Sequence, residues 1–308
     1  MMALRFREGV GMMVPVASAV KGPTFSEAAG GGIAMIELPE SLCLSLQAND
    51  WLAGKEVEQV EAGFHPHKFA WFSGDPADYP ALLAGTVIDR SLPVGGMLEI
   101  RLGTRRLLFG DGVCLRYVAP GDPKPQKHQL RLVFSDGSAL YASVAMYGGL
   151  WAFLDGTNDN PYYRVAREKP SPFTDGFDED WFRHLAQAAP EKVSLKGFLA
   201  TEQRIPGLGN GVLQDILFEA GMHPKRKLAT LDESERLRLY RSVRATLSEM
   251  AAGRGRDTET DLFGKPGGYV TKLSRNTVGK PCARCGETIC KETWMGGSIY
   301  WCPGCQPI

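Results

Sequence analysis

Four cysteines near the C-terminal end constrain the fold of this chain more than any other feature. Cys282 and Cys285 form one Cys-x-x-Cys pair, Cys302 and Cys305 form a second, and 16 residues separate the two pairs. Each Cys-x-x-Cys turn brings two sulfur atoms toward one ion, and four thiolates complete a tetrahedral zinc site. The spacing therefore predicts one structural Zn²⁺ held by a finger hairpin at residues 278–308, rather than two unrelated redox pairs.

The composition is that of a globular protein with a substantial core. The chain has 308 residues, of which 44% are hydrophobic and 23% charged, and no stretch is apolar enough for a membrane span. Residues 1–190 carry a net charge of −5 and residues 191–308 carry +5, so a basic face can occur on a neutral protein. Seven cysteines without a secretory signal indicate a reducing compartment and metal binding rather than disulfides.

Residues 1–34 do not show the pattern of a folded element. They contain four methionines and the run Gly30-Gly31-Gly32, and they lack a regular hydrophobic period. We expect a disordered leader or a start codon assigned too far upstream. In the second case Met35 is the first residue of the protein.

Residues 35–155 are expected to form a β-sandwich domain that begins with a short helix at about residues 39–52. Apolar and polar residues then alternate in short runs, which predicts strands. Clusters of glycine, proline, aspartate and serine separate these runs and predict turns, one of them at 110–112. The predicted strands are Leu98–Leu102, Arg106–Phe109, Val113–Val118, Leu130–Phe134 and Ala139–Val144.

The hydrophobic period becomes helical after a polar, proline-containing linker at 155–178. Residues 179–265 are expected to form a helical domain, and Asp232 with Glu235 resembles a capping box at the start of its last helix. The predicted helices are Asp180–Ala189, Ser194–Thr201, Asn210–Ala220 and Asp232–Ala252.

A glycine-rich segment precedes the third of these helices. It reads Ile205-Pro-Gly-Leu-Gly-Asn210, and the following helix leads to Ala220-Gly-Met-His-Pro224. Free backbone N–H groups at such a helix start can bind a phosphate. A helix start of this kind, taken alone, is more often a simple turn.

In combination these motifs resemble the formamidopyrimidine-DNA glycosylase / endonuclease VIII family. The segment Met35-Ile-Glu-Leu-Pro-Glu40 is similar to the start of that family, and Lys127-His128 and Phe134–Gly137 are similar to its later strands. The resemblance covers about residues 35–306. It implies an α+β protein in which a helix–two-turn–helix element and a Cys₄ finger hold the DNA backbone. It also implies bifunctional glycosylase and AP lyase chemistry in base excision repair.

Several residues on which the family's chemistry depends are absent from this sequence. The family uses an N-terminal proline amine as the nucleophile that attacks the sugar, and Ile36 occupies that position. An isoleucine within a chain has no free amine, so Ile36 is expected only to pack. The other missing groups are the hairpin lysine, the finger arginine, the intercalating methionine and an Arg-Arg-Phe loop, which align with Gly96, Gly297, Asp111 and Ala145–Tyr147.

Other positions match the family. Glu37 and Glu40 correspond to the acids beside the nucleophile, although Glu37 could equally be a carboxylate at a helix start. The resemblance places His128, Lys196 and Asn210 at phosphate contacts. Tyr147, Met146 and Met97 could act as apolar wedges in a bent duplex, with core packing an equal alternative for Met97. Loss of catalytic groups does not entail loss of binding, because backbone contacts supply affinity by themselves.

The sequence therefore predicts a monomeric zinc protein that binds damaged or distorted double-stranded DNA, with weak or lost catalysis. One alternative is an active glycosylase/AP lyase that uses another amine, such as Lys196 or Lys55, with Glu37 as the acid. The second alternative is an interaction scaffold that uses the finger alone. A cytoplasmic, nucleoid-associated location is expected in a bacterium, and a nuclear or organellar one elsewhere.

Overall fold

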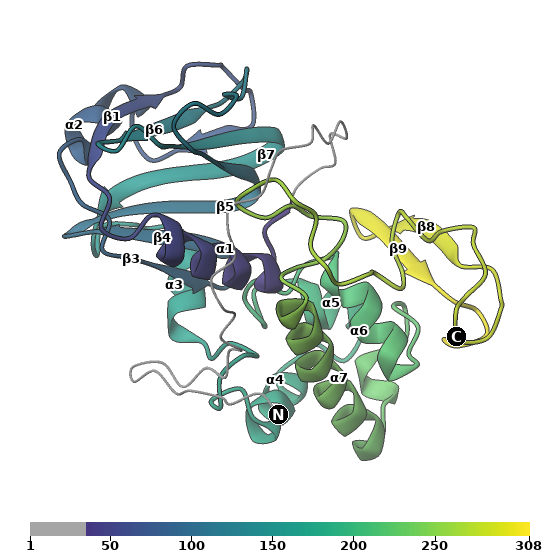
Figure 1. The fold of residues 1–308 in the computed structure, drawn as a ribbon. Helices are drawn as coiled ribbons and strands as arrows, with labels where there is room; N and C mark the ends of the chain where they lie inside the picture. Colours follow the sequence, from purple (N-terminus) through teal and green to yellow (C-terminus); the bar gives the residue numbers. More distant parts are fainter. Residues whose placement is uncertain (1–34) are drawn as a thin grey trace, which may run out of the picture.

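The chain divides between a curled sheet, a group of helices and a small C-terminal hairpin, as the computed structural model of residues 35–308 shows (Figure 1). The sheet lies at the upper left in the figure, helices α4 to α7 lie below it, and the yellow hairpin lies to the right. The predictions made for residues 1–34 fall outside the described residues.

Helix α1 (Leu38–Trp51) connects the sheet to the helices. It starts where Pro39 occupies the first turn, a position that needs no N–H donor. The N–H of Glu37 donates to the Glu40 carboxylate at 3.3 Å, which closes one half of a capping box. The helix packs against strands β3 and β4 on one side and against helix α7 on the other.

Seven strands form one sheet with the order β1-β6-β7-β5-β4-β3, and β2 adds to β7 in parallel. Inward residues from both ends of this sheet, such as Ile100 and Leu132, belong to one hydrophobic core, so the sheet curls into the expected sandwich. In chain order the strands are β1 (Val57–Ala62), β2 (Ala70–Phe72), β3 (Arg90–Val94), β4 (Met97–Leu102), β5 (Arg105–Val118), β6 (Leu130–Phe134) and β7 (Ala139–Leu154).

The turn predicted at 110–112 is wrong, because two predicted strands join there into the single strand β5. Asp111 has φ 56° and the register against β7 shifts between Asp111 and Val113, so the segment is a bulge. Turn residues act locally, whereas β7 pairs with β5 on both sides of the bulge and keeps the strand continuous. The bulge brings the Asp111 carbonyl to the start of the described chain, where it accepts from the N–H of Ile36 at 2.8 Å.

Some short helices were not predicted. The segment 155–178 contains α3 (Pro161–Glu168), whose first N–H groups, on Tyr162 and Tyr163, donate to the side chain of Asn160. The connection between β2 and β3 contains η1 (Pro76–Asp78) and α2 (Tyr79–Leu83). The sequence did not reveal these elements, because each is too short to show a hydrophobic period.

The four predicted helices are present, each shorter by one or two residues. Ser194 caps α5 (Leu195–Ala200), and Gly221 ends α6 (Val212–Ala220) in the left-handed region at φ 67°. The predicted capping box of Asp232 and Glu235 starts α7 (Glu233–Ala252). The remaining helices are α4 (Glu179–Gln187) and η2 (Leu228–Thr230), and no helix in the described range 35–308 is long and apolar enough to cross a membrane.

The last strands, β8 (Cys290–Trp294) and β9 (Gly297–Trp301), form the predicted hairpin. They pair antiparallel, with Cys290 opposite Trp301, and the turn between them contains Met295 at φ 49°. Strand β9 lies against α6, so the hairpin belongs with helices α4 to α7, which we call the helical lobe. The seven-stranded sheet forms the other part of the molecule, which we call the sheet lobe.

Candidate DNA-clamp site

The four predicted cysteines come together at the base of the hairpin. Their sulfur atoms all lie within 4.8 Å of one another. The Sγ atoms of Cys282 and Cys305 are 3.9 Å apart and those of Cys285 and Cys302 are 3.2 Å apart. A disulfide needs about 2.05 Å, whereas a tetrahedral ion with Zn–S bonds of about 2.3 Å separates its ligands by about 3.8 Å. The cluster is therefore arranged for a metal ion, and Cys290 lies outside it.

Two predicted phosphate-contacting side chains hold the hairpin against the helical lobe. The Nζ of Lys196 donates to the carbonyl of Trp294 at 2.5 Å, and the Nδ2 of Asn210 donates to that of Ser298 at 2.9 Å. Lys196 is buried, and Asn210 Oδ1 has no partner among the described residues. These side chains face the finger, so the structure gives them a docking role that sequence reasoning did not anticipate.

Glu37 spans the two lobes. Its Oε1 accepts from the N–H of Gly211 and its Oε2 from the N–H of Val212, both at 2.8 Å. The first N–H groups of a helix have no acceptor within the helix itself. Glu37 supplies that acceptor and so caps α6, which lies more than 170 residues away in the sequence. Burial raises the pKa of Glu37, against the opposing effect of Arg256. The glycine-rich segment thus binds a carboxylate of its own chain at this helix start.

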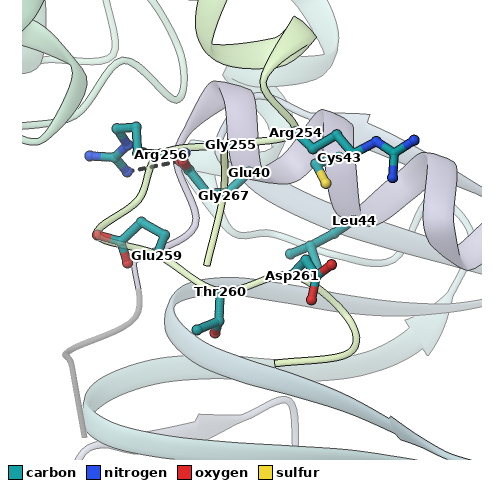
Figure 2. A pocket seen from close by; sticks show the side chains of 10 residues that line it. All are labelled: Glu40, Cys43, Leu44, Arg254, Gly255, Arg256, Glu259, Thr260, Asp261 and Gly267. Carbon is teal, nitrogen blue, oxygen red and sulfur yellow. Dashed lines mark hydrogen bonds and ion pairs between the residues drawn. The ribbon is translucent and has the colours of Figure 1, made fainter. Parts of the chain in front are cut away.

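Glu40 lies beside Glu37 and pairs with Arg256 (Figure 2). The Arg256 Nε and Nη2 atoms donate to the two Glu40 oxygens at 3.0 and 2.8 Å, and Nη1 lies 3.5 Å from Glu37 Oε2. Figure 2 shows this pair in a pocket between α1 and the segment after α7, and the pocket does not admit even a water molecule. Sequence reasoning missed Arg256, since nothing near it in the chain indicates a partner in α1.

A second missed residue, Glu259, lies beside the first described residues. Its Oε2 accepts from the backbone N–H of Met35 at 2.7 Å. Burial raises the pKa of Glu259 to about 7, while Arg256 acts to lower it. The buried Glu259 carboxyl therefore lies at the backbone of Met35, next to Ile36, which was predicted to occupy the position of the family's nucleophile.

Ile36 is buried in the core of the sheet lobe, and its N–H donates to the Asp111 carbonyl. The β3–β4 turn approaches it closely, because a Cβ on Gly96 would lie 2.9 Å from the Ile36 carbonyl oxygen. The same turn touches the glycine-rich segment, where a Cβ on Gly207 would lie 2.1 Å from the Gly96 nitrogen. The backbones of the two lobes thus meet at glycines. The β3–β4 turn, where the family's lysine was expected at Gly96, lies directly against the helical lobe.

The predicted wedge residues have different environments. Tyr147 is partly buried, and burial together with the charges of Asp111 and Glu37 raises its pKa. Met146 is exposed. Met97 is buried with Leu108 in a small core cluster, which excludes a wedge role and leaves only its core-packing alternative.

His128 is separate from these groups. It is buried, and its Nε2 lies 2.7 Å from an oxygen of Glu61, with the Phe64 ring stacked on it at 5.4 Å between ring centroids. The other ring nitrogen, Nδ1, is buried and has no partner among the described residues. A direct phosphate contact therefore requires this pair to open.

Comparisons with known proteins agree with this geometry. No family model matches the chain. It is 32% identical over 272 residues to a formamidopyrimidine-DNA glycosylase of Laribacter hongkongensis, which covers 82% of this chain and 98% of the relative. A glycosylase of the same name from Symbiobacterium thermophilum is 29% identical over 282 residues, covering 89% and 90%.

Solved structures have the same fold. The crystal structure of the MutM (Fpg) protein of Thermus thermophilus superposes with a TM-score of 0.72 and 25% identity, covering 88% of this chain and 98% of that one. The complex of the Lactococcus lactis Fpg with DNA containing an abasic site gives a TM-score of 0.75 at 24% identity, covering 88% and 100%. Because a formamidopyrimidine-DNA glycosylase 32% identical to this chain is matched over 98% of its length, this chain belongs to the formamidopyrimidine-DNA glycosylase / endonuclease VIII family.

Proposed function

We propose that this protein is a zinc-containing DNA-binding member of its family, which holds damaged or distorted duplex DNA between its two lobes and has lost proline-type catalysis. The proposal rests mainly on the hydrogen bonds that the Glu37 carboxylate and the Ile36 nitrogen already form. The Glu37 carboxylate caps α6, and the neighbouring Ile36 nitrogen is a backbone amide already bonded to Asp111. A secondary amine beside a free acid, as the family's reaction requires, is not present there.

DNA as the partner is supported by the relatives and by charge. The Lactococcus lactis structures that this fold resembles contain abasic-site DNA and Fapy-dG-containing DNA. Helices α5 to α7 and the finger lie within residues 191–308, which carry a net charge of +5. Phosphate contacts require positive charge and N–H donors rather than a nucleophile, so binding can persist without turnover. We expect a monomer, located at the nucleoid in the cytoplasm if the source is bacterial and in the nucleus or an organelle otherwise.

We assign one structural Zn²⁺ to the four cysteines. Four thiolates close the coordination sphere, which leaves no position for a reacting water and favours a structural ion. Cys282 and Cys302 pack with Phe218, Leu273 and Ile289 in a small core. This core is too small to hold the finger by itself, so the ion is expected to stabilise the hairpin that Lys196 and Asn210 contact.

An active lyase is the second candidate, and one observation favours it. Burial lowers the pKa of Lys196, which increases the fraction of neutral amine available for attack on a sugar. Its Nζ is bonded to the Trp294 carbonyl, so attack requires that bond to open. The other amine considered, that of Lys55, is paired with Asp136.

Borohydride trapping on abasic-site DNA separates these candidates. A Schiff base between an amine and the sugar would be reduced to a stable protein–DNA adduct, and we expect none. An adduct that disappears in Lys196→Arg but persists in Lys55→Arg would establish the lyase and overturn the non-catalytic proposal. N-terminal sequencing and the intact mass of the native protein report whether a free amine can lie beside Glu37.

A scaffold that uses only the finger predicts no DNA affinity. A gel-shift experiment with an abasic-site duplex tests this alternative, because phosphate contacts make affinity fall as salt rises. Salt-dependent binding excludes the scaffold. Absence of binding at low salt overturns the DNA-binding proposal.

A further inference from the structure

The connection between β1 and β2, together with β2, exposes several large aromatic side chains. Phe64 is 57% exposed, Phe69 is 48% exposed and Trp71 is 45% exposed. Residues 62–74 contain one lysine and two histidines, and no aspartate or glutamate. Large rings are normally buried, so three exposed rings within eight residues of a basic segment require an explanation.

These rings are held in place rather than carried on a free loop. Strand β2 pairs in parallel with β7, with Ala70 opposite Gly148, and the N–H of Gly148 donates to the Phe69 carbonyl at 2.9 Å. Trp71 is the middle residue of β2, and Phe69 lies in the turn that leads into this strand.

A fourth ring and an exposed methionine extend this surface along β7. The Tyr147 ring centroid lies 5.9 Å from that of Trp71, with the planes inclined by 40°. Met146, the preceding residue, is 44% exposed. At the other end Phe64 stacks on the buried His128 ring with an interplanar angle of 7°. We call Phe64, Phe69, Trp71 and Tyr147 the aromatic strip.

The charges around the aromatic strip suit a phosphodiester chain. The Lys68 ammonium lies 5.3 Å from the centroid of the Phe69 ring, and Lys127 is exposed beside His128. The acid on the neighbouring strand, Glu61, is already paired with His128 and Arg131, at 2.7 and 3.5 Å. Burial raises the pKa of Asp111, the acid whose charge acts on Tyr147.

We propose that the aromatic strip is a binding site for single-stranded DNA, in which unpaired bases stack on Phe69, Trp71 and Tyr147 while Lys68 and Lys127 contact the phosphates. Stacking proteins combine sequence-tolerant aromatic faces with nearby cations in this way. A duplex cannot use the strip, because its base faces are already stacked on one another. The site goes beyond the proposed duplex clamp. Tyr147 precedes Gly148, which pairs with Asp111 beside Ile36, so this end of the strip would receive a strand that is unpaired in the proposed clamp.

The test measures anisotropy of a labelled oligo(dT) of about 12 nucleotides, a length within the site sizes of stacking proteins. We expect Trp71→Ala and Phe69→Ala each to weaken binding by about tenfold. Trp71→Phe keeps a ring and should restore most of the affinity. Tyr162→Ala is the matched control, since Tyr162 is 58% exposed on α3 outside the aromatic strip. Thermal unfolding of each variant checks that it folds.

The same preparations are also titrated with an abasic-site duplex, so that the two proposals can fail separately. Strip-dependent binding of oligo(dT) supports the single-strand site whatever the duplex result. Duplex binding without oligo(dT) binding, or oligo(dT) binding that Trp71→Ala and Tyr162→Ala change equally, overturns the single-strand site alone. If the strip binds a protein partner instead of DNA, the duplex should bind and oligo(dT) should not. Loss of duplex binding alone overturns the clamp.

Discussion

Glu40 and Arg256 form a two-point ion pair that is almost completely removed from water. Their side chains are 4% and 2% exposed, and the two hydrogen bonds measure 3.0 and 2.8 Å. Burial acts to lower the pKa of Arg256, but Glu37 and Glu40 raise it above its ordinary value. One guanidinium therefore faces two buried carboxylates that belong to α1 and its cap.

Replacement of Arg256 by methionine should destabilise the protein strongly. The substitution leaves Glu37 and Glu40 buried without a counter-charge, and breaking such a pair costs about 3–5 kcal/mol of unfolding free energy. Urea unfolding measures the loss. Lys55→Met is the control, because the Lys55–Asp136 pair is partly exposed and contributes about 0–1 kcal/mol. Equal losses in the two variants would contradict the role given to Arg256.

Stability should depend on pH through Glu259. Its pKa rises from 4.5 to about 7 on folding because the carboxyl is buried, so the folded state binds a proton that the unfolded state has released. The resulting stabilisation is complete below pH 4.5 and is lost as pH rises through about 7. It amounts to at most about 3 kcal/mol. Glu259→Gln should remove this loss. The unfolding midpoint of the variant should therefore change less between pH 5 and 8 than that of the wild type. An unchanged slope would contradict the assignment.

Metal analysis should find about one zinc per chain, held by the four cysteines. Cys282→Ser should lower this content and the melting temperature, because the packing of Phe218 and Leu273 depends on the finger. A chelator should have the same effect on the wild-type protein. Cys114→Ser, at a cysteine outside the cluster, should leave both values unchanged. Full stability without metal would show that the ion is not structural.

Restoring the family's hairpin lysine should not restore activity. A side chain at Gly96 would lie 2.9 Å from the Ile36 carbonyl and 3.1 Å from the Gly207 Cα, and neither backbone atom can move freely. Gly96→Lys should therefore cost about 1–3 kcal/mol, as overpacked sites do, with no gain in strand cleavage at abasic sites. A stable variant that cleaves DNA would refute this argument.

The finger position behaves differently, because Gly297 has room. A Cβ there would lie 3.5 Å from the Asn210 side chain, an ordinary van der Waals contact. Gly297→Arg should fold normally and bind abasic-site duplex several-fold more tightly, with the salt slope increased by about one phosphate contact. Gly297→Gln is the uncharged control. An identical salt slope for both variants would exclude a phosphate contact at this position.

Features encoded by neighbouring residues could be predicted from the sequence. The cysteine spacing identified the metal cluster, and the Asp232–Glu235 capping box located the start of α7. Both signals operate over three to a few tens of residues. The sequence predicted two strands in place of β5 because Gly110 and Gly112 resemble a turn. Pairing with β7 on both sides of these residues keeps β5 a single strand.

The candidate site depends on partners that are distant in the sequence. Arg256 meets Glu40 across 216 positions, so no local pattern could pair them. Lys196 and Asn210 are of residue types that often contact phosphate, but the docked hairpin offers carbonyls that satisfy them first. The residue types predicted that these side chains form polar contacts. Their partners, backbone carbonyls of the hairpin, could be known only from the way the hairpin packs.

The approach of Gly96 to Gly207 has a mechanical consequence. Where two lobes touch through backbone atoms, no side-chain rotation can widen the gap, and the Glu37 cap fastens the same junction. A duplex held between such lobes must itself supply the curvature, at a deformation energy set by its own stiffness. DNA weakened by a missing base or a nick bends at lower cost than intact DNA. A stiff protein of this kind would therefore distinguish lesions by their flexibility, before any contact with a base.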